Sequence, residues 1–79
     1  MANYFVNMGG RTISYTPEKK SFVVQIAKGK GSFATVAERG LPITAQASFH
    51  GLAKIAGQKR RLAFRDASGI IHNIITIQD

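Results

Sequence analysis

Turn-forming residues interrupt the chain about every ten positions and divide it into short segments in which polar and apolar side chains alternate. The interruptions lie at 9–10, 17–20, 29–31, 39–42 and 66–69. Short runs rich in β-branched and aromatic residues between such turns are typical of a small antiparallel sandwich or barrel. The pattern therefore predicts a mostly β protein.

Alternation within the segments predicts which side chains share a face. The expected strands span 3–8, 11–16, 21–28, 32–38, 60–66 and 69–78. The first two flank Gly9-Gly10, a dipeptide that tolerates the positive φ angles of a tight hairpin turn. In 32–38, the alternation places Phe33, Thr35 and Ala37 on one face.

Two later segments carry further information. In 60–66, alternation directs Leu62 and Phe64 inward and sends Arg61 and Arg65 outward. The last segment, 69–78, is apolar on both faces, because isoleucines occupy odd and even positions alike. A strand of that kind is expected at the centre of a sheet or in a homodimer interface formed through 69–78.

The stretch 43–58 fits two patterns. Alternation favours a strand over 43–50, followed by a short helical turn or an irregular loop over 51–57. The alternative is a helix over 44–56 with Gly57 as its C-cap. Gly51 would weaken that helix by ~1 kcal/mol. We therefore expect a strand here and at most one short helix around 44–57.

The order of these elements suggests two architectures. With a helix in the middle, the order resembles an OB-type barrel in which 3–16 form one long bent first strand. Without it, the order resembles an SH3-like barrel or a strongly twisted sheet that dimerises. The predicted fold class is thus a small antiparallel barrel or a strongly twisted sheet.

Length and composition set further limits. The 79 residues contain no Cys, so we expect a single domain over 1–79 that no disulfide stabilises. A domain of this size buries only roughly 60% of its unfolded surface, and its core is thin. No apolar run approaches the ~18 residues of a membrane span, and no basic region precedes a long apolar stretch near the N-terminus. We expect a cytoplasmic protein with no membrane partner.

Charge is the strongest functional signal. Eleven Lys and Arg stand against four Asp and Glu, which gives a formal net charge of +7, spread over both halves of the chain. Such self-repulsion in a small domain indicates an anionic partner such as nucleic acid. The candidate nucleic-acid-binding residues are the basic ones at 58–65 and in one turn, with two tyrosines for base stacking: Lys59, Arg60, Arg61, Arg65, Lys28, Lys30, Tyr4 and Tyr15.

Three functions compete. The leading one is a non-catalytic nucleic-acid-binding domain, with single-stranded DNA or RNA favoured and weak sequence preference. The first alternative is a small interaction, inhibitor or assembly protein of the phage or plasmid type that docks on an acidic protein. The second is a metal-independent ribonuclease that would use His50, His72, Glu38 and Arg61. With two His, four acids and no Cys, we expect neither a metal site nor a cofactor.

Overall fold

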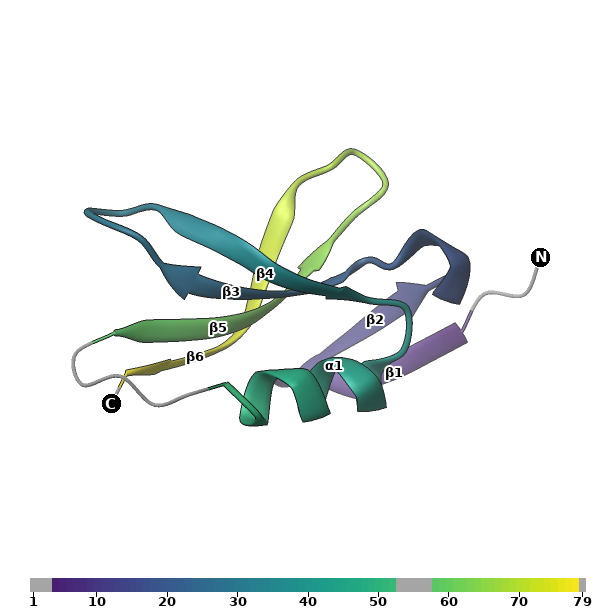
Figure 1. The fold of residues 1–79 in the computed structure, drawn as a ribbon. Helices are drawn as coiled ribbons and strands as arrows, with labels where there is room; N and C mark the ends of the chain where they lie inside the picture. The colour runs from purple at the N-terminus through teal and green to yellow at the C-terminus, as the bar shows by residue number, and fades with distance from the viewer. Residues whose placement is uncertain (1–3, 53–57, 79) are drawn as a thin grey trace.

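Antiparallel strands make up most of the protein. The computed structural model describes residues 4–52 and 58–78, and Figure 1 shows their arrangement. The elements in chain order are β1 (Tyr4–Met8), β2 (Arg11–Tyr15), the 3₁₀ turn η1 (Pro17–Lys19), β3 (Phe22–Ala27), β4 (Phe33–Arg39), α1 (Pro42–His50), β5 (Lys59–Arg65) and β6 (Ile71–Gln78). The predicted mostly β fold is confirmed.

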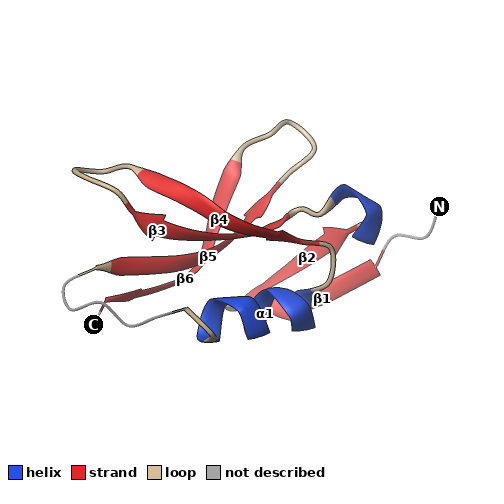
Figure 2. Cartoon of the chain, in the orientation of Figure 1, coloured by secondary structure: helices blue, strands red, loops and turns tan. Residues whose placement is uncertain are grey.

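The strands form two separate antiparallel sheets. One has four strands in the order β4-β3-β5-β6, and the other is the β1–β2 hairpin. Figure 2 shows that the four-stranded sheet is strongly twisted and that the two sheets do not close into a barrel. The twisted sheet is therefore the correct form of the two predicted. The long bent strand over 3–16 is wrong, because Gly9 and Gly10, with φ of 58° and 78°, turn the chain back into a hairpin.

The predicted strand over 43–50 is wrong, because this segment is helix α1. Pro42 stands in the first helical turn, where its fixed φ suits the helix and its missing N–H costs nothing. Ala45 and Phe49, four residues apart, are the buried side chains of the helix, whereas Ile43 is exposed. Gly51 ends the helix instead of weakening its interior, since its N–H donates to the Ala47 carbonyl. The part of the competing helix at 53–56, with its C-cap Gly57, lies outside the described residues.

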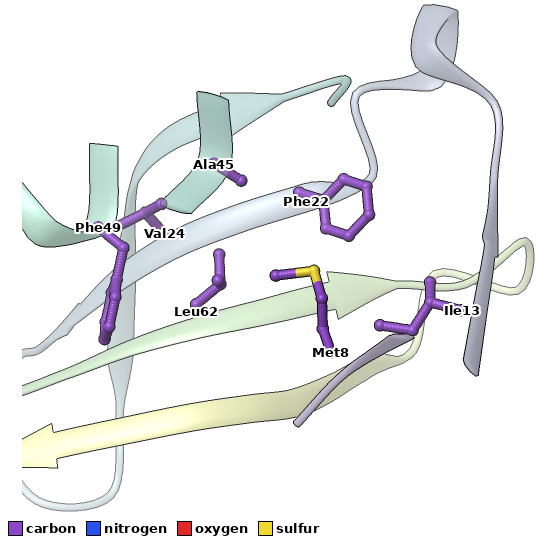
Figure 3. Packing of buried hydrophobic residues seen from close by; sticks show 7 residues of the cluster. All are labelled: Met8, Ile13, Phe22, Val24, Ala45, Phe49 and Leu62. Atoms are coloured by element: carbon purple, nitrogen blue, oxygen red, sulfur yellow. The ribbon is translucent and has the colours of Figure 1, made fainter. Parts of the chain in front are cut away.

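The core lies between one face of the four-stranded sheet and a layer made by α1 and the β1–β2 hairpin. Its buried cluster, seen in Figure 3, takes residues from β1, β2, β3, α1 and β5. They are Met8, Ile13, Phe22, Val24, Ala45, Phe49 and Leu62. Met8 and Ile13 bring the hairpin onto the same side of the sheet as α1. That side is called the covered face.

A bulge in β4 changes which residues reach the covered face. Val24 of β3 pairs with Ala37, but the next residue, Gln25, pairs with Thr35, so that Val36 is the extra residue. A bulge of one residue reverses the alternation beyond it. Ala37 therefore lies on the covered face with Val24, and the prediction that Thr35 and Ala37 share a face is wrong.

A second bulge lies in β6. Ile75 pairs with Leu62, whereas Asn73 pairs with the following residue of β5, and Ile74 is the extra residue. Because of this bulge, the consecutive residues Ile74 and Ile75 can both contact the same core. Together with Ile77 they pack against the buried cluster.

The prediction that the segment 69–78 forms a central strand is wrong. Among the described residues β6 pairs with β5 alone and lies at the edge of the sheet. Its isoleucines are partly rather than fully buried, and Ile70, just before the strand, is 58% exposed. The homodimer interface through 69–78 stays a prediction.

Two close backbone approaches require glycine. A Cβ on Gly9 would stand 2.8 Å from the carbonyl oxygen of Ile74, at the point where the hairpin turn meets β6. A Cβ on Gly40 would overlap the carbonyl of Pro17, where η1 meets the link between β4 and α1. These contacts fix how the hairpin and η1 sit against the rest of the fold.

Candidate nucleic-acid interface

One face of the four-stranded sheet is open. The helix and the hairpin both pack on the covered face, and no element of residues 4–52 and 58–78 crosses the opposite one (Figure 1). The strand register identifies the side chains of this open face. They are Phe33, Thr35 and Glu38 of β4, Val23, Gln25 and Ala27 of β3, Lys59, Arg61, Ala63 and Arg65 of β5, and Ile71, Asn73 and Thr76 of β6.

Three of the predicted basic residues share this face because they alternate along β5. Lys59, Arg61 and Arg65, here called the β5 basic row, lie on one side of the strand with the small Ala63 between the two arginines. Four residues of strand separate Arg61 from Arg65, a distance of about 13 Å between their Cα atoms. The row is a line of positive charge along β5, in which Lys59 is exposed and both arginines are partly exposed.

Arg61 is held in place by residues of two other strands. Its Nε donates to Oε1 of Gln25 at 2.6 Å, and Nε2 of Gln25 donates to Oγ1 of Thr35 at 3.0 Å. The Cζ atom of Arg61 lies 4.0 Å from the centroid of the Phe33 ring. The guanidinium is thus fixed by a hydrogen bond at its edge and a ring against its plane.

Arg65 is paired with an acid of the same face. Its Nη2 lies 2.8 Å from Oε1 of Glu38 and also donates to the carbonyl of Lys20 at 3.4 Å. Both side chains of the ion pair remain partly exposed, so that solvent screens the attraction. Lys20 extends the positive charge beyond the end of β5.

The turn between β3 and β4 brings Lys28 and Lys30 to the other end of the row. Both lysines are exposed. Just before β5, Nε2 of Gln58 donates to the carbonyl of Ala27, the last residue of β3, at 3.3 Å. The end of β3 therefore lies beside the start of β5. Folding places Lys28 and Lys59, far apart in sequence, at the same end of the sheet.

Arg60 differs from its neighbours. It pairs with Ile26 and Ile77 in the sheet and lies on the covered face, where it is only 4% exposed. Strict alternation in β5 sends it away from the basic row. Its predicted place among the exposed basic residues is wrong, and it is not part of the candidate interface.

The two predicted stacking residues also lie elsewhere. Tyr4 and Tyr15 pair across the β1–β2 hairpin, and their rings stack with centroids 5.7 Å apart. Tyr15 then meets the buried Phe22 edge-on, at 5.2 Å. Tyr4 is 49% exposed, but the hairpin packs on the covered face, so that neither tyrosine joins the β5 basic row.

The residues proposed for a ribonuclease do not converge. Glu38 and Arg61 lie on the open face, whereas His72 pairs with Phe64 on the covered face. His50 is the last residue of α1. No interaction among the described residues joins two of these four side chains, and an acid–base pair needs to meet at one phosphate.

His72 instead supports the turn between β5 and β6. Its Nε2 lies 2.8 Å from Oδ2 of Asp66, whose Oδ1 accepts hydrogen bonds from the backbone N–H groups of Ser68 and Ile70. The hydrogen bond with His72, followed by that from Ile70, lowers the pKa of Asp66 below its usual value. The carboxylate is thus a turn-stabilising group.

Sequence reasoning missed Phe33, Gln25 and Thr35 as neighbours of the basic row. The sequence gives a partial signal, because alternation in 32–38 does pair Phe33 with Thr35. Their meeting with Arg61 depends on the strand order β4-β3-β5, which local patterns do not contain.

Other site types find little support in the described part of the chain. Its His, Asp and Glu side chains form no group of three or more that could hold a metal ion. No helix within 4–52 and 58–78 is long and apolar enough to span a bilayer. Comparison with known proteins yields no matching family, curated protein or solved structure.

Proposed function

We propose that this protein is a non-catalytic nucleic-acid-binding domain that holds the phosphate backbone on its open face. The observation that carries the proposal is the β5 basic row on a sheet face that no described element covers. Lysine and arginine attract phosphates regardless of base sequence, and a line of them follows a backbone without reading it. Weak sequence preference and strong salt dependence are the expected properties.

The rest of the charge distribution supports this assignment. Lys28 and Lys30 lie at one end of the row and Lys20 at the other, so that positive charge extends beyond β5 in both directions. The net charge of +7 adds long-range attraction for a polyanion. Glu38 is the acidic residue of the open face among the described strands, and Arg65 neutralises it.

A second candidate is an interaction protein that docks on an acidic protein. The favouring observation is exposed apolar surface away from the basic row, where Phe5 is 71% and Ile43 73% exposed. Exposed apolar side chains are more typical of protein contacts than of phosphate contacts.

Titration of fluorescent oligonucleotides tests the proposal. Single-stranded and duplex DNA and RNA are titrated at two salt concentrations, with anisotropy as the readout. We expect binding that weakens steeply with salt. The double variant Arg61→Ala/Arg65→Ala should weaken binding to many sequences alike and flatten the salt slope by about one to two units.

Arg11→Ala is the matched control for each single arginine change, since Arg11 is an exposed residue of the hairpin. It should alter the salt slope less than Arg61→Ala does. Failure of the wild-type protein to bind any oligonucleotide at low salt would refute the proposal and favour the acidic-protein candidate.

A further inference from the structure

Arg61 is more firmly oriented than attraction of phosphate by charge alone requires. A lysine attracts phosphate as a point charge on a flexible stem and needs no fixed orientation, whereas the planar fork of arginine can be oriented in advance. Arg61 bonds Gln25 through Nε, and Gln25 is itself only 6% exposed and bonded to Thr35. The guanidinium plane is therefore oriented by side chains from three adjacent strands.

The row of the sheet that contains Arg61 explains this rigidity. Thr35, Gln25, Arg61 and Thr76 are successive register partners across β4, β3, β5 and β6. The bulge at Val36 is what aligns Thr35 with Gln25. Because this polar row crosses the whole sheet, the position of the Arg61 side chain is set by strand pairing and not by local loop geometry.

Phe33 covers one side of the guanidinium. The Cζ-to-centroid distance of 4.0 Å is that of a stacked cation–π contact. Arg61 is partly exposed in spite of this contact. With Phe33 against one side of the guanidinium plane, the opposite side is the one at which a second flat group could stack.

We propose that the Arg61–Phe33 pair is a stacking platform for an unpaired nucleobase, so that the preferred ligand is single-stranded. The inference rests on the proposed function and adds a base contact to it. Arginine planes and aromatic rings both stack on bases, and every base offers a face. In a duplex the bases already stack on one another and cannot reach a side chain on an open sheet.

The surroundings of the platform fit a single strand. Lys59 lies two residues before Arg61 on the same face, and Arg65 lies four residues after it. Of the small side chains on this face, Ala27 is partly exposed, whereas Ala63 is fully buried, so that a base can meet the sheet only at the partly exposed side chains around Arg61. Phosphates on either side of the stacked base then meet a cation.

The test compares a thymidine dodecamer with an abasic oligonucleotide of equal length and charge, both labelled for anisotropy. The wild-type protein should bind the thymidine strand roughly 5- to 100-fold more tightly, which corresponds to stacking of one base. Arg61→Lys keeps the charge and removes the plane. It should bring the affinity for the thymidine strand close to that for the abasic strand.

Two further variants separate the effect of the ring from the effect of charge. Phe33→Leu removes the ring without touching any charge and should reduce the preference for the thymidine strand in the same direction. Lys59→Ala removes charge only and should weaken both ligands by similar factors. Thermal melting of each variant shows that the comparison is made between folded proteins.

The outcomes separate the two proposals. Equal, salt-sensitive binding of the thymidine and abasic strands by the wild-type protein would overturn the stacking platform and leave the phosphate-binding function standing. The same holds if Arg61→Lys keeps the full preference. If neither strand binds at low salt, both proposals fail.

Discussion

Arg65 and Glu38 form an ion pair that spans a strand. The Nη2 of Arg65 on β5 lies 2.8 Å from Oε1 of Glu38 on β4, and β3 runs between them. Val23, the β3 partner of Glu38, is fully buried on this otherwise open face. The ion pair thus lies over Val23. Glu38 also competes with phosphate for Arg65.

Removing the acid should therefore improve binding. Glu38→Gln keeps the shape of the side chain but no longer competes for Arg65. We expect affinity for single strands to rise about 2- to 5-fold at low salt, in line with the up to ~1 kcal/mol of an exposed ion pair. Glu18→Gln, an equal charge change in η1, is the control and should give a smaller increase.

The hairpin turn gives a test of the fold. Gly9→Ala should lower the free energy of unfolding by roughly 1–3 kcal/mol, because the new Cβ meets the Ile74 carbonyl and φ is positive. Gly10→Ala also has positive φ, but its Cβ would meet nothing within 4 Å. Chemical denaturation gives the free energy of unfolding of both variants, and the difference between them measures the contact of Gly9 with β6. Equal losses of stability in the two variants would contradict this contact.

Acid should remove the contribution of Asp66. Its pKa is lowered in the folded protein, mainly by the hydrogen bond with His72. The carboxylate therefore stabilises the fold fully at pH values above the usual Asp pKa of 3.8, and this stabilisation is lost as the pH falls below 3.8 through the lowered value. Asp66→Asn should melt below the wild type at neutral pH, and the two melting temperatures should converge in acid. A constant gap across that range would show that the charge of Asp66 plays no part.

The isoleucines of β6 should differ in their importance. Ile75 packs against the core opposite Leu62, so Ile75→Asp buries a charge and should cost at least ~3 kcal/mol, enough to unfold a thin-cored domain. Ile70→Asp, at an exposed site, should leave the melting temperature within a few degrees of wild type. Thermal melting monitored by circular dichroism measures both variants. Equal melting temperatures would contradict the register of β6.

Dimerisation through 69–78 is measurable in the same protein. An edge strand offers backbone groups to which another copy can add a strand. Sedimentation equilibrium should then show a mass that doubles as concentration rises. A monomer mass at every concentration would exclude the dimer and leave β6 as a simple edge.

The strand pattern could be predicted because its signals are local. Gly9-Gly10 and the later turns mark strand ends that the structure places within two residues. The face of Leu62 could also be predicted, because β5 alternates without a bulge. The same alternation places Arg60 on the covered face, since it lies between Lys59 and Arg61.

What local pattern could not supply is pairing. The face of Ala37 depends on a bulge that appears only when β4 meets β3, and the platform of Arg61 on Phe33 depends on strand order. The helix at Pro42–His50 could not be told from a strand by pattern alone. Ala45 and Phe49 are four residues apart, and this spacing places them on one face in either element. The assembled sheet buries both residues against one face, and this burial favours the helix over the strand.

The separation of the two sheets has a kinetic consequence. Among the described residues, β1 and β2 pair only with each other, whereas β3 and β5 each pair with a strand on both sides. Amide protons of the hairpin should therefore exchange with solvent through a local opening, long before those of β3 and β5. Opening of the hairpin would expose Met8 and Ile13 but would break none of the strand pairing that aligns Lys59, Arg61 and Arg65. The alignment of the three cations should then last as long as β3 and β5 stay paired, whether or not the hairpin is open.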